Sequence, residues 1–206
     1  IDELVARCEP YEIIVMGTRL PMEVLDHCER VRFVQLMAAG FDTFNIPSLT
    51  ERGVLFANSS PTLGIAVAEH AITLMLTVKH RLITSWLSVQ HGKWAAEAEP
   101  DLIMELSGAT VGIVGLGHIG REVARQLRGW ETDLLYCDVV AQPADVEREL
   151  GVRRVGLEAL LEAADVVTLH TPLDAHTRGL IGQQELARIK PTAILINTSR
   201  GPVVDE

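Results

Sequence analysis

A glycine-rich segment carries the clearest chemical signal in this sequence. Gly115, Gly117 and Gly120 have the spacing G-x-G-x-x-G, and they come directly after the apolar run 111–114. In such a turn the first glycine permits a tight bend, the second lets a pyrophosphate approach the backbone, and the third lets a helix pack on a strand. The N–H groups that begin the following helix can then bind the phosphate. The pattern gains weight from the strand before it and the helix after it.

An acidic residue stands where a dinucleotide site needs one. Asp138 follows the next apolar run, 134–137, and lies 18 positions beyond Gly120. A carboxylate there accepts hydrogen bonds from the hydroxyls of an adenosine ribose and repels a 2′-phosphate. No Arg or Lys follows within the next several residues, which favours NAD over NADP. The alternatives are a structural glycine turn with a solvated carboxylate, or a related turn that binds FAD or S-adenosylmethionine.

Strand and helix signals alternate around these residues. Continuous apolar strands between amphipathic helices indicate a parallel sheet covered on both faces, so the predicted fold class is α/β with a doubly wound Rossmann sheet. The helical segment 63–81 is apolar on most sides and is expected to be buried. A change of composition near residues 59–64 predicts a domain junction. We expect strands at 12–16, 31–36, 53–57, 111–114, 134–137, 165–169 and 193–197, and helices at 1–7, 21–29, 63–81, 143–150 and 182–189.

Composition restricts the classes of partner. The 206 residues include 18 Lys and Arg against 28 Asp and Glu, a formal net charge of −10. This excess argues against binding to nucleic acid or to an anionic membrane, because both need a positive field. The cysteines Cys8, Cys28 and Cys137 have no metal-like spacing, so we expect no metal site and a reducing cytoplasm. The longest stretch without charged residues, 53–68, is too short and too polar to span a membrane.

Further sequence blocks extend over the chain and carry a family resemblance. They are Ala39-Gly40-Phe41-Asp42, 66–71, Gly92-Lys93-Trp94, 111–121, His170-Thr171-Pro172-Leu173 with Thr177, and 197–206. In their order and spacing, the sequence resembles the D-isomer-specific 2-hydroxyacid dehydrogenases across nearly its whole length. The resemblance implies a flavodoxin-like substrate domain, of which residues 1–61 would be a part, and a Rossmann NAD-binding domain at 62–206, incomplete at its C-terminal end. Both ends of the sequence read as truncated.

The resemblance also implies an activity, the exchange of a hydride between NAD(H) and a small D-2-hydroxy or 2-keto acid. Arg200 is the expected catalytic residue, because a guanidinium can both grip the substrate carboxylate and polarise the carbonyl oxygen. It comes just after the expected strand 193–197, at the end of a parallel strand where ligands bind in such folds. Ala39 and Gly40 would offer backbone N–H groups to the substrate carboxylate.

The cofactor contacts implied by the resemblance involve several loops. His118 and Ile119 are assigned to the pyrophosphate and Asp138 to the adenosine ribose. His170, Thr171 and Pro172 would line the adenine side, and Ser59 and Thr198 would lie near the nicotinamide. The family's acid–base His and the Glu that orients it lie beyond the end of this sequence, so none of the seven histidines is given that role. A homodimer formed through the cofactor domain is expected by resemblance.

The substrate and the function class stay open at this point. Relatives that act on phosphoglycerate carry a basic residue where this chain has Leu36, which lowers the expectation of a phosphorylated substrate. Glyoxylate, hydroxypyruvate, D-lactate-like acids and 3-phosphoglycerate all remain. The alternative from another class is an NAD-sensing, corepressor-like binding module on the same scaffold. The acidic surface favours the enzyme.

Overall fold

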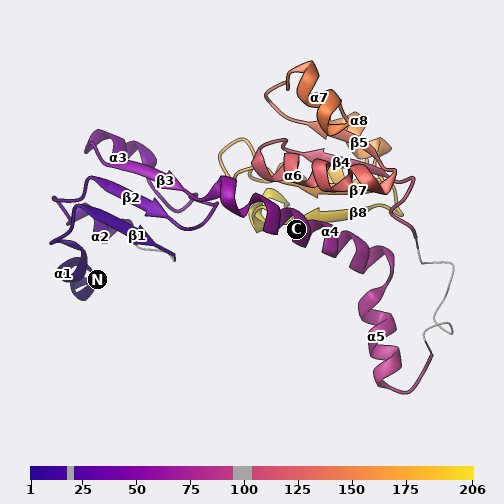
Figure 1. Ribbon diagram of the computed structural model, residues 1–206, viewed down its shortest axis with the longest axis horizontal. Coiled ribbons are helices and arrows are strands. Elements are labelled where there is room, and N and C mark those ends of the chain that lie inside the picture. The colour runs from indigo at the N-terminus through magenta and orange to yellow at the C-terminus, as the bar shows by residue number, and fades with distance from the viewer. Residues whose placement is uncertain (18–20, 95–103) are drawn as a thin grey trace. The chain divides into compact units, whose positions relative to one another are not determined.

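The chain divides into two compact units, which the computed structural model describes over residues 1–17, 21–94 and 104–206 (Figure 1). The first unit is Ile1–Leu63 and the second is Gly64–Glu206. The assignment of substrate binding to 1–61 and of cofactor binding to 62–206 stays a prediction about what each part does.

The first unit is built on a three-stranded parallel sheet. Its strand order is β1-β2-β3, and Ile13 is paired with Phe33, which is in turn paired with Leu55. One face of the sheet is buried against helices, whereas Ile13, Val15 and Leu55 on the other face are 61%, 65% and 70% exposed. The elements are α1 (Asp2–Cys8), β1 (Ile13–Met16), α2 (Met22–Asp26), β2 (Phe33–Leu36), α3 (Ile46–Glu51) and β3 (Leu55–Asn58).

The second unit contains a five-stranded parallel sheet of order β6-β5-β4-β7-β8. Starting from β4, the chain adds β5 and β6 on one side and then returns to add β7 and β8 on the other. This reversal is the Rossmann arrangement, and it leaves a crevice beyond the carboxyl end of β4. The strands are β4 (Thr110–Val114), β5 (Asp133–Cys137), β6 (Val152–Arg154), β7 (Val166–Leu169) and β8 (Ile194–Asn197).

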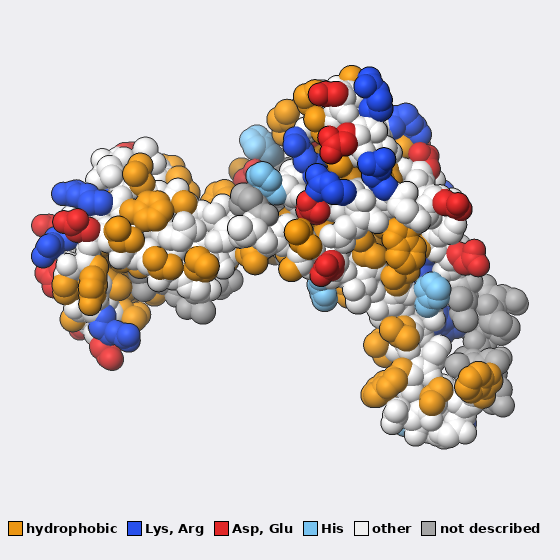
Figure 2. Space-filling model, in the orientation of Figure 1, with side chains coloured by type: hydrophobic (Ala, Val, Ile, Leu, Met, Phe, Trp, Pro, Cys, Tyr) orange, Lys and Arg blue, Asp and Glu red, His pale blue; other side chains and the backbone are white. Residues whose placement is uncertain are grey.

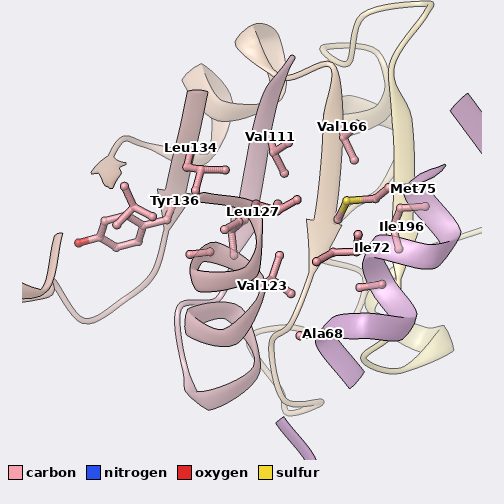
Figure 3. Packing of buried hydrophobic residues seen from close by; sticks show 14 of the residues in the cluster. Ala68, Ile72, Met75, Val111, Val123, Leu127, Leu134, Tyr136, Val166 and Ile196 are labelled. Carbon is pink, nitrogen blue, oxygen red and sulfur yellow. The ribbon is translucent and has the colours of Figure 1, made fainter. Parts of the chain in front are cut away.

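Helices cover both faces of this sheet. Val111 and Ile113 of β4 belong to the cluster packed against α4 and α6, whereas Val114 belongs to the cluster packed against α8. Figure 3 shows α4 beside β7 and β8, and α6 beside β4 and β5. A Cβ at Gly112 would lie 3.1 Å from the Ala164 Cβ, so the glycine lets α8 approach closely. The helices are α4 (Ser60–Lys79), α5 (Leu82–Gln90), α6 (His118–Leu127), α7 (Ala144–Leu150), α8 (Leu157–Ala163) and α9 (Gln183–Leu186), with 3₁₀ turns at Arg128–Trp130 and Gly201–Val203.

Helix α4 differs from its expected burial. Ala68 and Met75 are fully buried against the sheet, but Ile65 and Val78 are 55% and 49% exposed. The helix is apolar around most of its circumference, yet only one side meets the core of its unit. By length and mean hydropathy (1.3), Thr62–Lys79 could also cross a membrane, a test that the core helices of many proteins pass. Its buried side, packed into the cluster of the Rossmann sheet, identifies it as a core helix.

Four elements were not anticipated from the sequence, and one of them is the short helix α3 of the first unit. Strand β6 has only three residues, of which Val152 is buried and two arginines are exposed, so it presents no apolar run. Helix α8 is short and joins β6 to β7. Helix α5 buries none of its residues in this unit, so no one-sided pattern marks it, and Figure 2 shows apolar side chains exposed along it.

Candidate cofactor and substrate site

The residues expected to do chemistry in the second unit gather at one edge of its sheet. Four loops begin there, at 115–117, 138–142, 170–172 and 198–200, after strands β4, β5, β7 and β8. Because all these strands are parallel, their carboxyl ends lie at the same edge. This edge includes the crevice where the strand order reverses, which is where ligands bind in such sheets.

The glycine turn is tightly packed at two positions and open at the third. Gly115 has φ +92°, and a Cβ there would lie 2.9 Å from the backbone carbon of His170. A Cβ at Gly120 would overlap the carbonyl oxygen of Gly115, whereas nothing lies within 4 Å of one at Gly117. The first and third glycines therefore permit close backbone packing, and the second leaves room for a ligand, as a pyrophosphate site requires.

Helix α6 begins directly at this open position. Gly117 is its N-cap, and His118 and Ile119 are its first two residues. The first N–H groups of a helix have no partner within the helix, and the helix dipole favours an anion beside them. The predicted pyrophosphate residues thus stand where a phosphate can be bound.

Asp138 is held against the glycine turn. Its Oδ2 accepts a hydrogen bond from the Leu116 N–H at 2.7 Å, and its Oδ1 accepts one from the Val140 N–H at 2.9 Å. The carboxylate is partly exposed, and each of its oxygens has further acceptor capacity. It is therefore oriented beside the turn and can still accept hydroxyl donors, which fits the predicted ribose contact.

His170 and Thr198 are brought together by the neighbouring strands β7 and β8, which they follow. The Thr168 Oγ1 lies 2.9 Å from His170 Nε2, and the Thr198 Oγ1 lies 3.4 Å from His170 Nδ1. Burial lowers the pKa of His170 from 6.5 to about 4. The ring is therefore neutral at pH 7, with one nitrogen donating and the other accepting.

The lowered pKa of His170 makes the stability of the protein depend on pH. Below pH 6.5 His170 becomes protonated in the unfolded chain, whereas in the folded chain it stays neutral until about pH 4. The contribution of His170 to the free energy of unfolding is therefore fully present above pH 6.5 and is lost as the pH falls. Between pH 7 and pH 5 we expect a loss of about 2 kcal/mol from this residue. Urea unfolding at both pH values should show that loss in the native protein and not in His170→Gln. His91→Gln, which alters an exposed histidine, should behave as the native protein does; equal pH dependence in all three would contradict this account.

Thr171 supplies the sharpest test of whether a ligand fits. Its Oγ1 is buried and has no hydrogen-bond partner among the described residues. A buried hydroxyl left without a partner costs about 1–3 kcal/mol, so a ligand that hydrogen-bonds it would be stabilised there. Thr171 comes directly after His170, whose backbone packs against Gly115, so Thr171 lies beside the glycine turn. Together with the open position at Gly117, it makes the crevice fit a dinucleotide, with Pro172 exposed at its rim.

Arg200 is positioned by a residue to which the sequence analysis gave no role. The Oδ1 of Asn197, at the end of β8, accepts hydrogen bonds from the Ser199 N–H (3.0 Å) and hydroxyl (2.8 Å), and its Nδ2 donates to the Arg200 carbonyl (2.8 Å). The Arg200 Nη1 donates to the Ser199 carbonyl at 2.8 Å. An Asn followed two residues later by Ser is a signal for such a turn, and it could have identified Asn197.

The remaining predicted residues belong to the first unit. Ala39 and Gly40 follow β2, and Ser59 follows β3, so they lie at the carboxyl edge of that sheet. The Asn58 Nδ2 donates to the Ala39 carbonyl at 2.7 Å, and the Ser59 Oγ donates to the Leu36 carbonyl at 3.1 Å. Their contacts with substrate and nicotinamide stay predictions.

No metal centre is evident in the part of the chain that the structure describes. Within 1–17, 21–94 and 104–206, no three His, Cys, Asp or Glu side chains group as metal ligands. The three cysteines are free, and burial raises the pKa of the Cys28 and Cys137 thiols. Neither of these two thiols is therefore activated as a nucleophile.

Comparison with known proteins agrees with this geometry. Residues 72–206 match the family model "D-isomer specific 2-hydroxyacid dehydrogenase, NAD binding domain". The chain is 37% identical to a glyoxylate reductase of Korarchaeum cryptofilum over all of its own length and 62% of that protein. It is 34% identical to a D-3-phosphoglycerate dehydrogenase of Archaeoglobus fulgidus, covering 39% of it. The chain thus spans less than two thirds of the length of these relatives.

Solved structures show the same likeness. The holo form of D-mandelate dehydrogenase from Rhodotorula graminis superposes with a TM-score of 0.89 at 28% identity, over 100% of this chain and 66% of that one. D-lactate dehydrogenase from Aquifex aeolicus, complexed with NAD and lactic acid, has a TM-score of 0.86 at 28% identity, over 98% and 60%. The family model covers the glycine turn, Asp138, the 170–172 loop and Arg200, and its match extends over well more than half of the chain. The chain belongs to the D-isomer specific 2-hydroxyacid dehydrogenase family.

Proposed function

We propose that the full-length protein is an NAD-dependent oxidoreductase that interconverts a small D-2-hydroxy acid and the corresponding 2-keto acid. The observation that carries the proposal is the placement of Arg200 at the same sheet edge as the glycine turn, with an unpartnered Thr171 hydroxyl in the crevice between β4 and β7. An anion-binding cation and a dinucleotide site at one edge are what this reaction needs.

Each residue of the site then has a role in holding the cofactor or the substrate. When NAD(H) is bound, its nicotinamide supplies the hydride exchange. The start of α6 binds the pyrophosphate, Asp138 the adenosine ribose, and Thr171 donates its hydroxyl to the cofactor. Arg200, held by Asn197, binds the substrate carboxylate and stabilises negative charge on the C2 oxygen. The proton transfer is assigned to the family's His–Glu pair, which this sequence does not include.

The substrate class is proposed from relatives and from one side chain. The Korarchaeum relative is named a glyoxylate reductase, and we propose that this protein likewise acts on a small, unphosphorylated 2-keto acid. Leu36 occupies the position where relatives that act on phosphoglycerate carry a basic residue. It is an uncharged side chain, 3% exposed and packed in the core of its unit, so this position supplies no cation for a phosphate. Glyoxylate and hydroxypyruvate are therefore preferred to 3-phosphoglycerate.

The direct experiment is NADH consumption by the full-length protein with a panel of 2-keto acids. We expect turnover with glyoxylate or hydroxypyruvate well above that with phosphorylated acids. Binding of NADH without turnover of any acid would contradict the enzyme assignment and favour an NAD-sensing binding module. A preference for the phosphorylated acid would instead contradict the argument from Leu36.

The proposal includes a cytoplasmic homodimer without nucleic acid or membrane partners. Helix α5 supports the homodimer, because four of its apolar residues are more than half exposed, namely Leu82, Ile83, Trp86 and Val89. Apolar patches of this kind mark interfaces. We expect sedimentation velocity to give a dimer and Trp86→Lys to give a monomer. Trp130→Lys, at an exposed tryptophan outside α5, should remain a dimer; a dimeric Trp86→Lys protein would show that α5 is not the interface.

A further inference from the structure

The peptide that joins Leu116 to Gly117 lies in the middle of the glycine turn, directly before helix α6. In a trans peptide the C=O and the N–H point in opposite directions. The direction of the Leu116 carbonyl therefore decides where the Gly117 N–H points. With the N–H on the ligand side the turn offers a donor to a phosphate, whereas the reversed peptide would offer a carbonyl oxygen that repels it.

The residue types of the turn do not fix this peptide. Its reversal changes ψ of Leu116 and φ of Gly117, and glycine adopts φ values of either sign at little cost. No atom lies within 4 Å of a Cβ at Gly117, and the Leu116 side chain is fully buried and would keep its place. The open position that admits a pyrophosphate thus needs another group to hold the peptide in one direction.

Arg121 supplies that group from the first turn of α6. Its Nε donates to the Leu116 carbonyl oxygen at 3.3 Å, while the Leu116 N–H donates to Asp138 Oδ2 at 2.7 Å. Two side chains therefore hold both backbone polar groups of Leu116. The helix dipole disfavours a cation in the first turn, so helix stability does not account for an arginine at this position.

The guanidinium of Arg121 is itself anchored by the loop after β5. Its Nη2 hydrogen-bonds the Gln142 side-chain oxygen. The Gln142 N–H donates to the Tyr136 hydroxyl at 3.0 Å, and that hydroxyl donates to Glu147 Oε1 at 2.6 Å. Tyr136 is fully buried and Glu147 belongs to α7. The Nε–H group of Arg121 is therefore oriented toward the glycine turn by contacts with β5 and α7.

We propose that Arg121 is a positioning residue of the cofactor site, which holds the Leu116 carbonyl and thereby turns the Gly117 N–H toward the pyrophosphate. It acts through the backbone of the turn as a hydrogen-bond donor, and its positive charge is not required. The inference rests on the dinucleotide site of the proposed function, but not on which acid the protein reduces.

Two uncharged substitutions of matched length separate the donor from the charge. Arg121→Gln keeps an N–H donor at the position of Nε, whereas Arg121→Met places a methyl group there. Both remove the charge and the hydrogen bond from Nη2 to Gln142. In calorimetric titration of the full-length protein with NADH, we expect Arg121→Gln to bind within about threefold of the native affinity and Arg121→Met about tenfold or more weakly.

Urea unfolding of the same variants separates positioning from a merely structural role. A structural role would lower the free energy of unfolding but leave the folded variants with equal affinity for NADH. Arg125 provides the matched control, because it lies one turn further along α6 and pairs with Glu122. Arg125→Met removes the same charge from the same helix and should keep the NADH affinity within about twofold of native.

The possible outcomes distinguish this inference from the proposed function. Equal weakening in Arg121→Gln and Arg121→Met would overturn it, because the charge would then be the cause, and native affinity in Arg121→Met would overturn it as well. If Arg121→Met does not fold, Gln142→Leu removes the anchor and leaves Arg121 in place; it should weaken NADH binding, and native affinity there would overturn the inference. A native protein that does not bind NADH would refute the dinucleotide site itself.

Discussion

Replacing Gly120 with alanine should destabilise the Rossmann unit by about 3 kcal/mol, the upper end of the usual cost of overpacking in a close-packed interior. The added methyl group would overlap the Gly115 carbonyl oxygen, and the Gly115 backbone is itself packed against that of His170. Neither side of this contact is a flexible side chain, so relief requires α6 to move off β4. The cost exceeds the gain of ~1 kcal/mol that alanine brings to a helix interior. Urea unfolding measures the difference.

Gly117→Ala is the control that separates folding from binding. Its φ is −74°, which alanine adopts freely, and nothing lies within 4 Å of the new Cβ. We expect stability within about 0.5 kcal/mol of the native protein. NADH affinity should fall about tenfold or more, because the methyl group fills the space through which a pyrophosphate approaches the backbone. Native stability in Gly120→Ala, or native affinity in Gly117→Ala, would contradict the geometry of the turn.

Arg200→Ala should reduce turnover of the full-length protein by about 10³-fold or more, as expected when a donor to a developing oxyanion is removed. The same change should leave the dissociation constant for NADH within about threefold of its native value, because most of the expected cofactor contacts belong to other loops and Thr198, in the same loop, is unchanged. Steady-state assays with glyoxylate or hydroxypyruvate and a separate NADH titration measure the two effects independently.

Two further variants sharpen the result. Arg200→Lys keeps the charge but loses the planar fork, so we expect intermediate turnover with a raised KM. Arg188→Ala removes an exposed arginine that pairs with Glu158 and Glu162, and it should not affect turnover. Native turnover in Arg200→Ala would show that another cation binds the substrate.

Local sequence patterns predicted most of the strands and the glycine turn of the second unit. The glycine turn, Asp138 and Arg200 each follow an apolar strand, and parallel strands necessarily bring their carboxyl ends to one edge. The Rossmann class was thus predictable, and the structure and the family match confirm it. The strand order was not predicted, because β6 presents no apolar run. The acid substrate of the proposed enzyme was not predictable, because the small 2-keto acids share the carboxylate and carbonyl groups that Arg200 would bind.

Other features depend on contacts distant in sequence. Arg154 reaches the Asp138 carbonyl through the pairing of β5 with β6, a strand whose three residues include a single buried one, so no hydrophobic pattern marks it. Helix α4 was expected to be buried because apolar residues surround it, but burial depends on which neighbours a helix meets. The role of Asn197 depends on hydrogen-bond geometry within a turn. The roles of Ala39, Gly40 and Ser59 stay predictions.

The unpartnered hydroxyl of Thr171 also bears on the stability of the protein without its cofactor. Valine has nearly the same shape and would suit a buried position without a hydrogen-bond partner better than threonine does. Threonine therefore lowers the stability of the free protein, and a bound dinucleotide that hydrogen-bonds its hydroxyl would offset that loss.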